Sequence, residues 1–108
     1  MGLFKKKYEK NVGQGDTFLK SYAIRINGLM RFAEGNAKVT DELQKLQHDF
    51  RFTVATPAKE AKKIEKRIEE KYEALKDTIQ QTSWDEQAVI LLIRSIGLEI
   101  DELNALRR

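Results

Sequence analysis

The C-terminal stretch of this chain, residues 83–108, reads SWDEQAVILLIRSIGLEIDELNALRR. Its apolar residues recur at steps of three and four, which is the spacing of one face of an α-helix. This stripe consists of Val89, Leu92, Ile93, Ile96, Ile100 and Leu103. Three further apolar residues, Ile90, Leu91 and Leu98, fall outside it. A helix that is apolar on two sides either lies at the centre of its domain or forms half of an interface.

The same spacing recurs upstream and predicts an all-α fold. We expect an antiparallel up-down bundle of four helices, at about 16–34, 40–52, 57–81 and 84–107. The connections within the first pair and within the last pair are only a few residues long, so each pair must fold back as a hairpin. A chain of 108 residues with 41% hydrophobic residues supports one core. Residues 16–108 are therefore predicted to form a single helical domain.

Residue types at the predicted helix starts agree with known capping preferences. Asp16 and Thr40 are the expected N-caps of the first two helices, because their side-chain oxygens can accept hydrogen bonds from unpaired backbone N–H groups. Pro57 fits the first position of the third helix, where the N–H that it lacks would have had no partner. The weak helix formers before Pro57 favour a break over a kink. Ser83 and Glu86 have the spacing of a capping box and mark the start of the fourth helix.

The third helix has a narrow apolar face, with charges sorted by sign on either side of it. At about 100° per residue, one flank is basic and the other is acidic. In coiled-coil-like packing such flanks select the neighbouring helix and its direction, although each exposed pair contributes only about 0–1 kcal/mol. We therefore expect these charges to serve packing, and contact with phosphate or an acidic partner is the alternative. The basic flank is Lys63, Arg67 and Lys71, and the acidic flank is Glu65, Glu69 and Glu73.

The formal net charge of +3 comes entirely from the N-terminal segment, residues 1–15. Removing its four lysines and one glutamate from chain totals of 20 basic and 17 acidic residues leaves 16 of each. A neutral helical body argues against a dedicated nucleic-acid-binding domain. We predict a disordered basic tail, and its weak contact with nucleic acid or an anionic membrane is an alternative function. The lysines that would make these contacts are Lys5, Lys6, Lys7 and Lys10.

Several functional classes lack any pattern in this sequence. It contains no cysteine, no apolar run of roughly 18 residues that would span a membrane, and no apolar signal region at its start. A cytoplasmic protein is expected, and a cysteine-free exported protein is the alternative. The single histidine, His48, lies opposite the apolar stripe of its helix, and Lys45 stands where a di-iron bundle would need glutamate. No nucleophile triad or phosphate loop is recognisable. We therefore expect no enzyme activity, no metal site and no cofactor.

Three single residues carry smaller expectations. Gly28 and Gly97 lie inside predicted helices, where glycine costs up to about 1 kcal/mol relative to alanine. Close approach of a neighbouring helix is the expected reason, and simple tolerance of the cost is the alternative. The only tryptophan, Trp84, is expected to cover one end of the bundle.

The apolar residues outside the stripes carry our functional hypothesis. Leu91 and Leu98 are seven residues apart and share the side of the last helix that faces away from its stripe. We predict a helical protein-binding module that forms a homodimer through this second face or binds another helical protein. The alternative is that the last helix runs through the middle of the domain and uses both faces internally. The predicted interaction surface is Ile90, Leu91, Arg94 and Leu98, together with Ile24 and Phe32 of the first helix.

Overall fold

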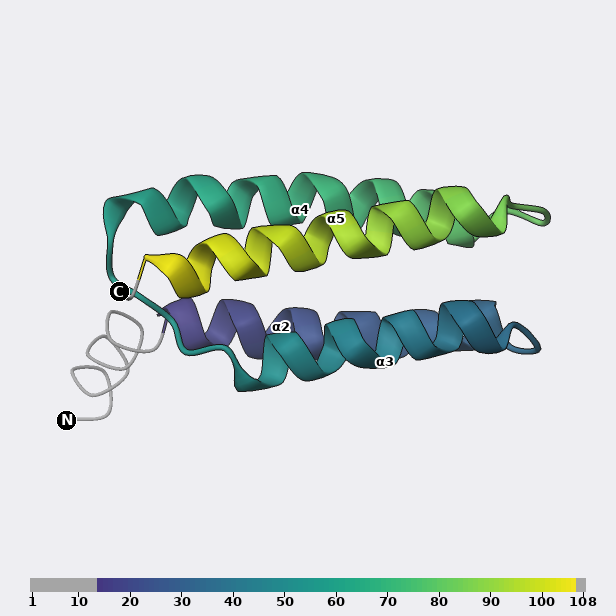
Figure 1. Cartoon of the computed structure of the whole chain (residues 1–108), viewed down its shortest axis with the longest axis horizontal. Coiled ribbons are helices and arrows are strands. Elements are labelled where there is room, and N and C mark those ends of the chain that lie inside the picture. The colour runs from purple at the N-terminus through teal and green to yellow at the C-terminus, as the bar shows by residue number, and fades with distance from the viewer. Residues whose placement is uncertain (1–13, 107–108) are drawn as a thin grey trace, which may run out of the picture.

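The computed structural model describes residues 14–106, and in that range it contains only helices, turns and irregular links. Four α-helices follow one another along the chain (Figure 1). They are α2 (Gln14–Leu29), α3 (Ala37–Phe52), α4 (Lys59–Ile79) and α5 (Glu86–Ala105), and a 3-10 turn, η1 (Met30–Ala33), continues α2. The prediction of an all-α bundle of four helices is confirmed. The predicted tail lies outside the described residues up to position 13, and its last two residues, Gln14 and Gly15, already belong to α2.

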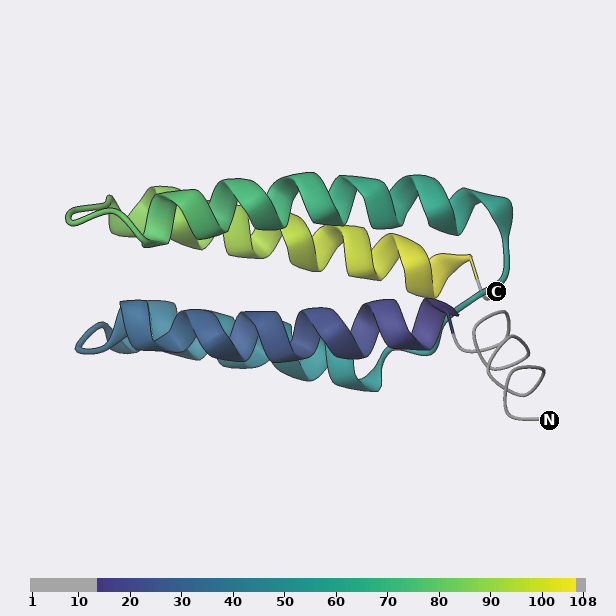
Figure 2. The same ribbon diagram turned by 180° about the vertical axis from the view of Figure 1, so that it is seen from behind.

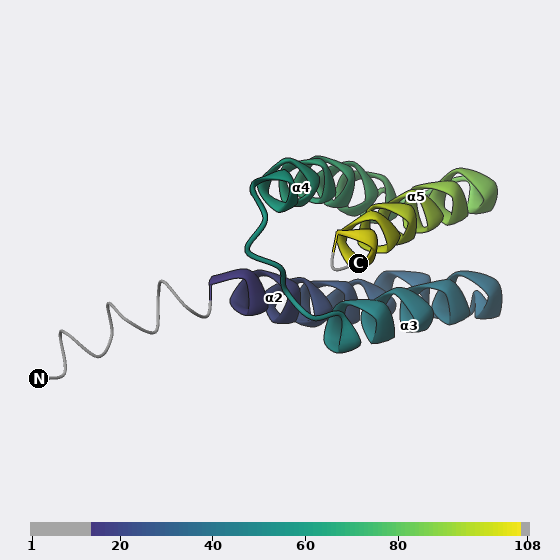
Figure 3. The ribbon, with the colours of Figure 1, turned by 60° about the vertical axis from the view of Figure 1, so that its left-hand side comes forward.

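The helices form two antiparallel hairpins that pack against each other. In Figure 1 the α4–α5 hairpin lies above the α2–α3 hairpin, and the view from behind in Figure 2 agrees. The hairpins meet mainly where α3 packs on α5, and these two helices run in the same direction. Figure 3 places α2 and α5 at diagonally opposite corners of the bundle. Within the described residues, α5 therefore has α4 on one side, α3 on the other, and no helix over its outer side.

Each helix contributes a buried apolar face to a common core. Tyr22 of α2 bridges three helices, since its ring centroid lies 5.8 Å from that of Phe50 in α3 and 5.1 Å from that of Tyr72 in α4. Trp84 is half-buried against this core, next to the α4–α5 connection. The stripe of α4 is buried along its whole length, at Ala61, Ile64, Ile68, Tyr72, Leu75 and Ile79.

The N-cap of α3 is Asn36 rather than the expected Thr40. The Asn36 side chain accepts a hydrogen bond from the backbone N–H of Val39 at 3.1 Å. Thr40 lies inside the helix, where its hydroxyl donates to the carbonyl oxygen of Ala33 at 3.2 Å. Gly35 precedes the cap with a φ of +88°, which L side chains rarely adopt. The chain therefore reverses at Gly35, and the next residue, Asn36, can cap the new helix. For this reason α3 begins earlier than predicted.

The capping box expected at Ser83 and Glu86 does not form. Asp85 is the N-cap of α5, and its carboxylate accepts from the backbone N–H of Ala88 at 2.9 Å. Aspartate caps as well as serine and also interacts with the positive end of the helix dipole, which explains the later start. The Glu86 side chain reaches the other hairpin instead, where it accepts from Nδ2 of Asn36 at 3.3 Å. This bond connects the tips of the two hairpins.

Two further helix starts differ from the sequence expectation. α2 begins at Gln14, so Asp16 lies within its first turn and is not its N-cap. α4 begins at Lys59 rather than Pro57, after a non-helical link, residues 53–58. This link crosses from one hairpin to the other, and extended backbone spans about 3.3 Å per residue against about 1.5 Å in a helix. The predicted break between the two helices is confirmed, with Pro57 inside the link.

Gly28 and Gly97 are not sites of close helix packing. A Cβ atom built on either glycine meets no atom of a neighbouring element within 4 Å. The expectation that a second helix approaches closely at these positions is therefore wrong.

Exchanging each of two glycines for alanine should shift stability in opposite directions. Gly28→Ala should raise the free energy of unfolding by about 0.5–1 kcal/mol, because alanine favours the helix and its methyl group meets open space. Gly35→Ala should lower it by about 1 kcal/mol or more, because a φ of +88° is strained for an L side chain. Urea denaturation of both variants measures these shifts. Shifts of the same sign would contradict the two backbone conformations.

Candidate interaction surface

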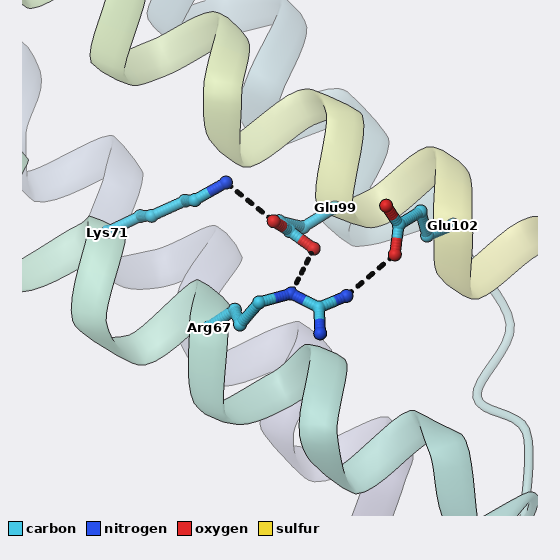
Figure 4. Close-up of polar contacts among 4 residues, drawn as sticks. All are labelled: Arg67, Lys71, Glu99 and Glu102. Atoms are coloured by element: carbon cyan, nitrogen blue, oxygen red, sulfur yellow. Dashed lines mark hydrogen bonds and ion pairs between the residues drawn. The ribbon is translucent and has the colours of Figure 1, made fainter.

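A buried carboxylate joins the two helices of the α4–α5 hairpin. Glu99 of α5 is only 5% exposed. Arg67 of α4 donates from Nε to one of its oxygens at 2.9 Å, and Lys71 donates from Nζ to the other at 2.5 Å. Arg67 also donates from Nη2 to Glu102, one turn further along α5, at 2.6 Å (Figure 4). Both carboxylate oxygens of Glu99 therefore have a charged partner on α4.

The charge of Glu99 is stable at neutral pH because of these partners. Burial raises the pKa of Glu99, but hydrogen bonds from Lys71 and Arg67 outweigh burial and bring the pKa below its ordinary value. The basic flank of α4 thus pairs with the neighbouring helix, and the prediction that its charges serve packing is confirmed for Arg67 and Lys71. A paired and hydrogen-bonded charge of this kind selects one geometry between two helices.

The Glu99 contacts fix the rotation of α5 about its own axis. At about 100° per residue, Leu91 and Leu98 both lie about a quarter turn from Glu99, on the same side. Because Glu99 faces α4, the two leucines point away from the bundle, with exposed fractions of 65% and 64%. We name this side of α5 the α5 ridge, and it consists of Leu91, Leu98 and Ala105, all of them exposed.

Carboxylates border the α5 ridge on its α3 side. Burial raises the pKa of Asp49 in α3, and the nearby Asp101 carboxylate of α5 raises it further. Arg94 is engaged elsewhere, since its guanidinium donates to Glu42 at 2.8 and 3.2 Å. These four side chains, Lys45 and Leu98 line a groove of about 420 Å³ between α3 and α5. Three carboxylates against two cations give this border of Leu98 a net negative charge, and we call it the acidic border.

The six residues predicted as an interaction surface do not form one patch. Ile90 is 5% exposed and belongs to the core, so its place on that surface is wrong. Phe32 lies in η1 and is half-buried against the core. Ile24 is 73% exposed, but it lies on α2, at the corner diagonal to α5. The other three residues, all on α5, lie near one another.

Sequence reasoning missed two features of the exposed surface. One is Glu99, which stands at a stripe position seven residues after Leu92, and a carboxylate there opposite a basic flank is a pattern that identifies such a pair. The other is a second exposed apolar region, where Phe52 and Val54 are 66% and 51% exposed. Both residues lie where α3 gives way to the link, and helical spacing says nothing about side chains beyond a helix end.

Replacing Glu99 by glutamine should destabilise the bundle in a pH-dependent way. At pH 7 we expect a loss of about 1–3 kcal/mol, because the charge-assisted bonds of the buried carboxylate disappear. Folding lowers the pKa of Glu99, so its contribution is complete above the unfolded pKa of about 4.5 and is lost as the pH falls through the folded value. Urea denaturation at decreasing pH should therefore show that the difference in free energy of unfolding between the variant and the unchanged protein disappears below about pH 4.5.

Glu102→Gln is the matched control for this experiment. Glu102 is exposed and pairs with the same arginine, so its loss should be clearly smaller. Equal losses in the two variants, or a gap for Glu99→Gln that stays constant with pH, would show that Glu99 does not stabilise the α4–α5 hairpin as a carboxylate.

Comparison of this chain with protein-family models, with curated proteins and with solved structures gives no match. Between residues 14 and 106, no helix is both long and apolar enough to cross a membrane. In the same range, no three His, Asp or Glu side chains are grouped so that they could hold a metal ion. The contacts predicted for Lys5, Lys6, Lys7 and Lys10 lie outside the described residues. The α5 ridge and its acidic border are thus the features from which a function can be argued.

Proposed function

We propose that this protein is a small helical assembly module whose copies associate through the α5 ridge. The observation that carries the proposal is the exposure of Leu91 and Leu98 while the contacts of Glu99 prevent α5 from turning them inward. The two leucines are seven residues apart, about 10.5 Å along the helix, which is the repeat at which coiled-coil helices place contact residues. Ala105, seven residues after Leu98, extends the ridge with a small side chain that allows a second helix to approach.

The size of the ridge sets the expected strength of association. Burying one leucine completely is worth about 1.5–3 kcal/mol, so covering the exposed two thirds of two leucines on each of two copies yields about 4–8 kcal/mol. Association costs at least about 4 kcal/mol in lost freedom. The leucines alone therefore yield at most about 4 kcal/mol net, which supports a dimer no tighter than about millimolar, and tighter association needs further contacts.

The partner that we propose is a second copy of this chain, with a dimer as the smallest assembly. Another helical protein with an apolar stripe would cover the ridge in a similar way. The mass of the isolated protein separates these two partners. The sequence contains no cysteine, which agrees with a reducing compartment, and we infer that the protein acts in the cytoplasm.

Charging the ridge should separate the copies without unfolding them. In the double variant Leu91→Glu plus Leu98→Glu, an interface would have to desolvate two carboxylates on each copy, which outweighs the apolar gain. We expect the variant to sediment as a monomer of 12.5 kDa with unchanged helical circular dichroism. The unchanged protein should show a larger average mass that rises with concentration.

Ala74→Glu plus Gln81→Glu is the matched control for the charge effect. It adds the same charge at the same seven-residue sequence spacing to two exposed positions, Ala74 in α4 and Gln81 in the connection that follows it. This control should associate like the unchanged protein. The proposal is wrong if the ridge variant keeps the mass of the unchanged protein, or if the unchanged protein stays at 12.5 kDa at every concentration. Loss of helicity in the ridge variant would show that the two leucines belong to the fold, which also contradicts the proposal.

A further inference from the structure

We propose that the α5 ridge of one copy docks into the groove between α2 and α3 of a second copy, so that assembly is head-to-tail. This inference rests on the proposed function and names the surface that receives the ridge. We call that surface the α2–α3 groove. It has a volume of about 430 Å³ and is lined by Lys20, Ala23, Ile24, Gln47, Arg51 and Phe52.

The α2–α3 groove offers the apolar contact that the ridge needs. Ile24 and Phe52 line it and are among the most exposed large apolar side chains of the described residues. Val54 continues the apolar surface into an adjoining pocket, which Phe52 also lines. One copy therefore exposes two separate apolar surfaces, the ridge and the groove, each with at least two large side chains. Docking one into the other covers both, and buries about as many large side chains as a ridge-to-ridge dimer would.

Charge favours docking of the ridge into the groove over a ridge-to-ridge dimer. Lys20 and Arg51 are the charged residues lining the groove, and no carboxylate of residues 17–106 lies within ion-pair distance of either. The ridge carries Asp49 and Asp101 on its border, so a ridge in a groove places acidic side chains near basic ones. A ridge on a ridge instead places two borders of the same net sign against each other, because each border has three carboxylates against Lys45 and Arg94. Arg94 is already bonded to Glu42.

The fold makes such docking intermolecular. The ridge lies on α5 and Ile24 lies on α2, and these helices occupy diagonal corners of the bundle (Figure 3). A copy therefore cannot place its own ridge in its own groove. Contact between two different surfaces is heterologous, and each complex keeps one unused ridge and one unused groove. Further copies can add at both ends, which explains how modest single contacts support an assembly.

Two variants that each lack one surface test this arrangement. The ridge variant is Leu91→Glu plus Leu98→Glu, and the groove variant is Lys20→Glu plus Arg51→Glu. Each variant alone should sediment at 12.5 kDa, with self-association of the groove variant weakened by about a hundredfold or more. An equimolar mixture should form a complex of twice that mass, because the mixture combines one intact ridge with one intact groove. The complex should not grow at higher concentration, because the two remaining surfaces are the altered ones.

Lys59→Glu plus Lys66→Glu, two exposed lysines of α4, makes the same charge change away from the groove and should associate like the unchanged protein. Head-to-tail docking is overturned if the groove variant associates like the unchanged protein, or if the mixture of two folded variants stays at 12.5 kDa. A ridge-to-ridge dimer gives the first of these results, because the groove variant keeps its ridge. If the proposed function itself is wrong, the results differ from these. The ridge variant alone would then associate, or the unchanged protein would be a monomer. If the groove variant loses helicity, Lys20→Gln plus Arg51→Gln is used in its place, with the same expected and contradicting results.

Discussion

The orientation of α5 depends on one buried carboxylate. Losing the charge-assisted bonds of Glu99 costs about 1–3 kcal/mol, which is comparable with the roughly 2–4 kcal/mol that turning α5 to bury Leu91 and Leu98 would yield. Such a turn would also carry residues of the present stripe, such as Ile96 and Ile100, out of the core. The electrostatic contact of Glu99 and the packing of the stripe therefore act in the same direction, and both keep the leucines in water.

The link between α3 and α4 connects the fold to both exposed surfaces. Residues 53–58 cross from one hairpin to the other, which places α5 beside α3 and leaves α2 at the far corner. With neighbours on two sides only, α5 has an outer side for the ridge. Because the link leaves α3 at this point, Phe52 and Val54 lie at the edge of the α2–α3 groove and not in the core. Ridge and groove are thus two consequences of one crossing.

The spacing of apolar residues predicted the helices, because a helix is a local structure. It did not predict how the four helices are arranged relative to one another. The apolar stripes identify four helices and most of the core, because a buried helix face repeats about every 3.6 residues. The same spacing cannot tell how wide a face is, and Ile90 is buried because α5 contacts α3 as well as α4. Asn36 and Asp85 replace the expected caps because each helix start offers two capping side chains, Asn36 or Thr40 and Ser83 or Asp85, and the position of the reversal selects between them. The diagonal placement of Ile24 follows from the link, which has no helical pattern.

A single cysteine at position 98 gives the most direct measurement of whether the ridge is exposed in one copy and covered in an assembly. The chain contains no cysteine, so Leu98→Cys supplies its only thiol, and the rate of alkylation by a small maleimide reports on that position alone. We expect fast alkylation in dilute protein and progressively slower alkylation as the concentration rises. Slow alkylation even at high dilution would place the side chain inside the bundle, and a rate independent of concentration would show that no second copy covers it.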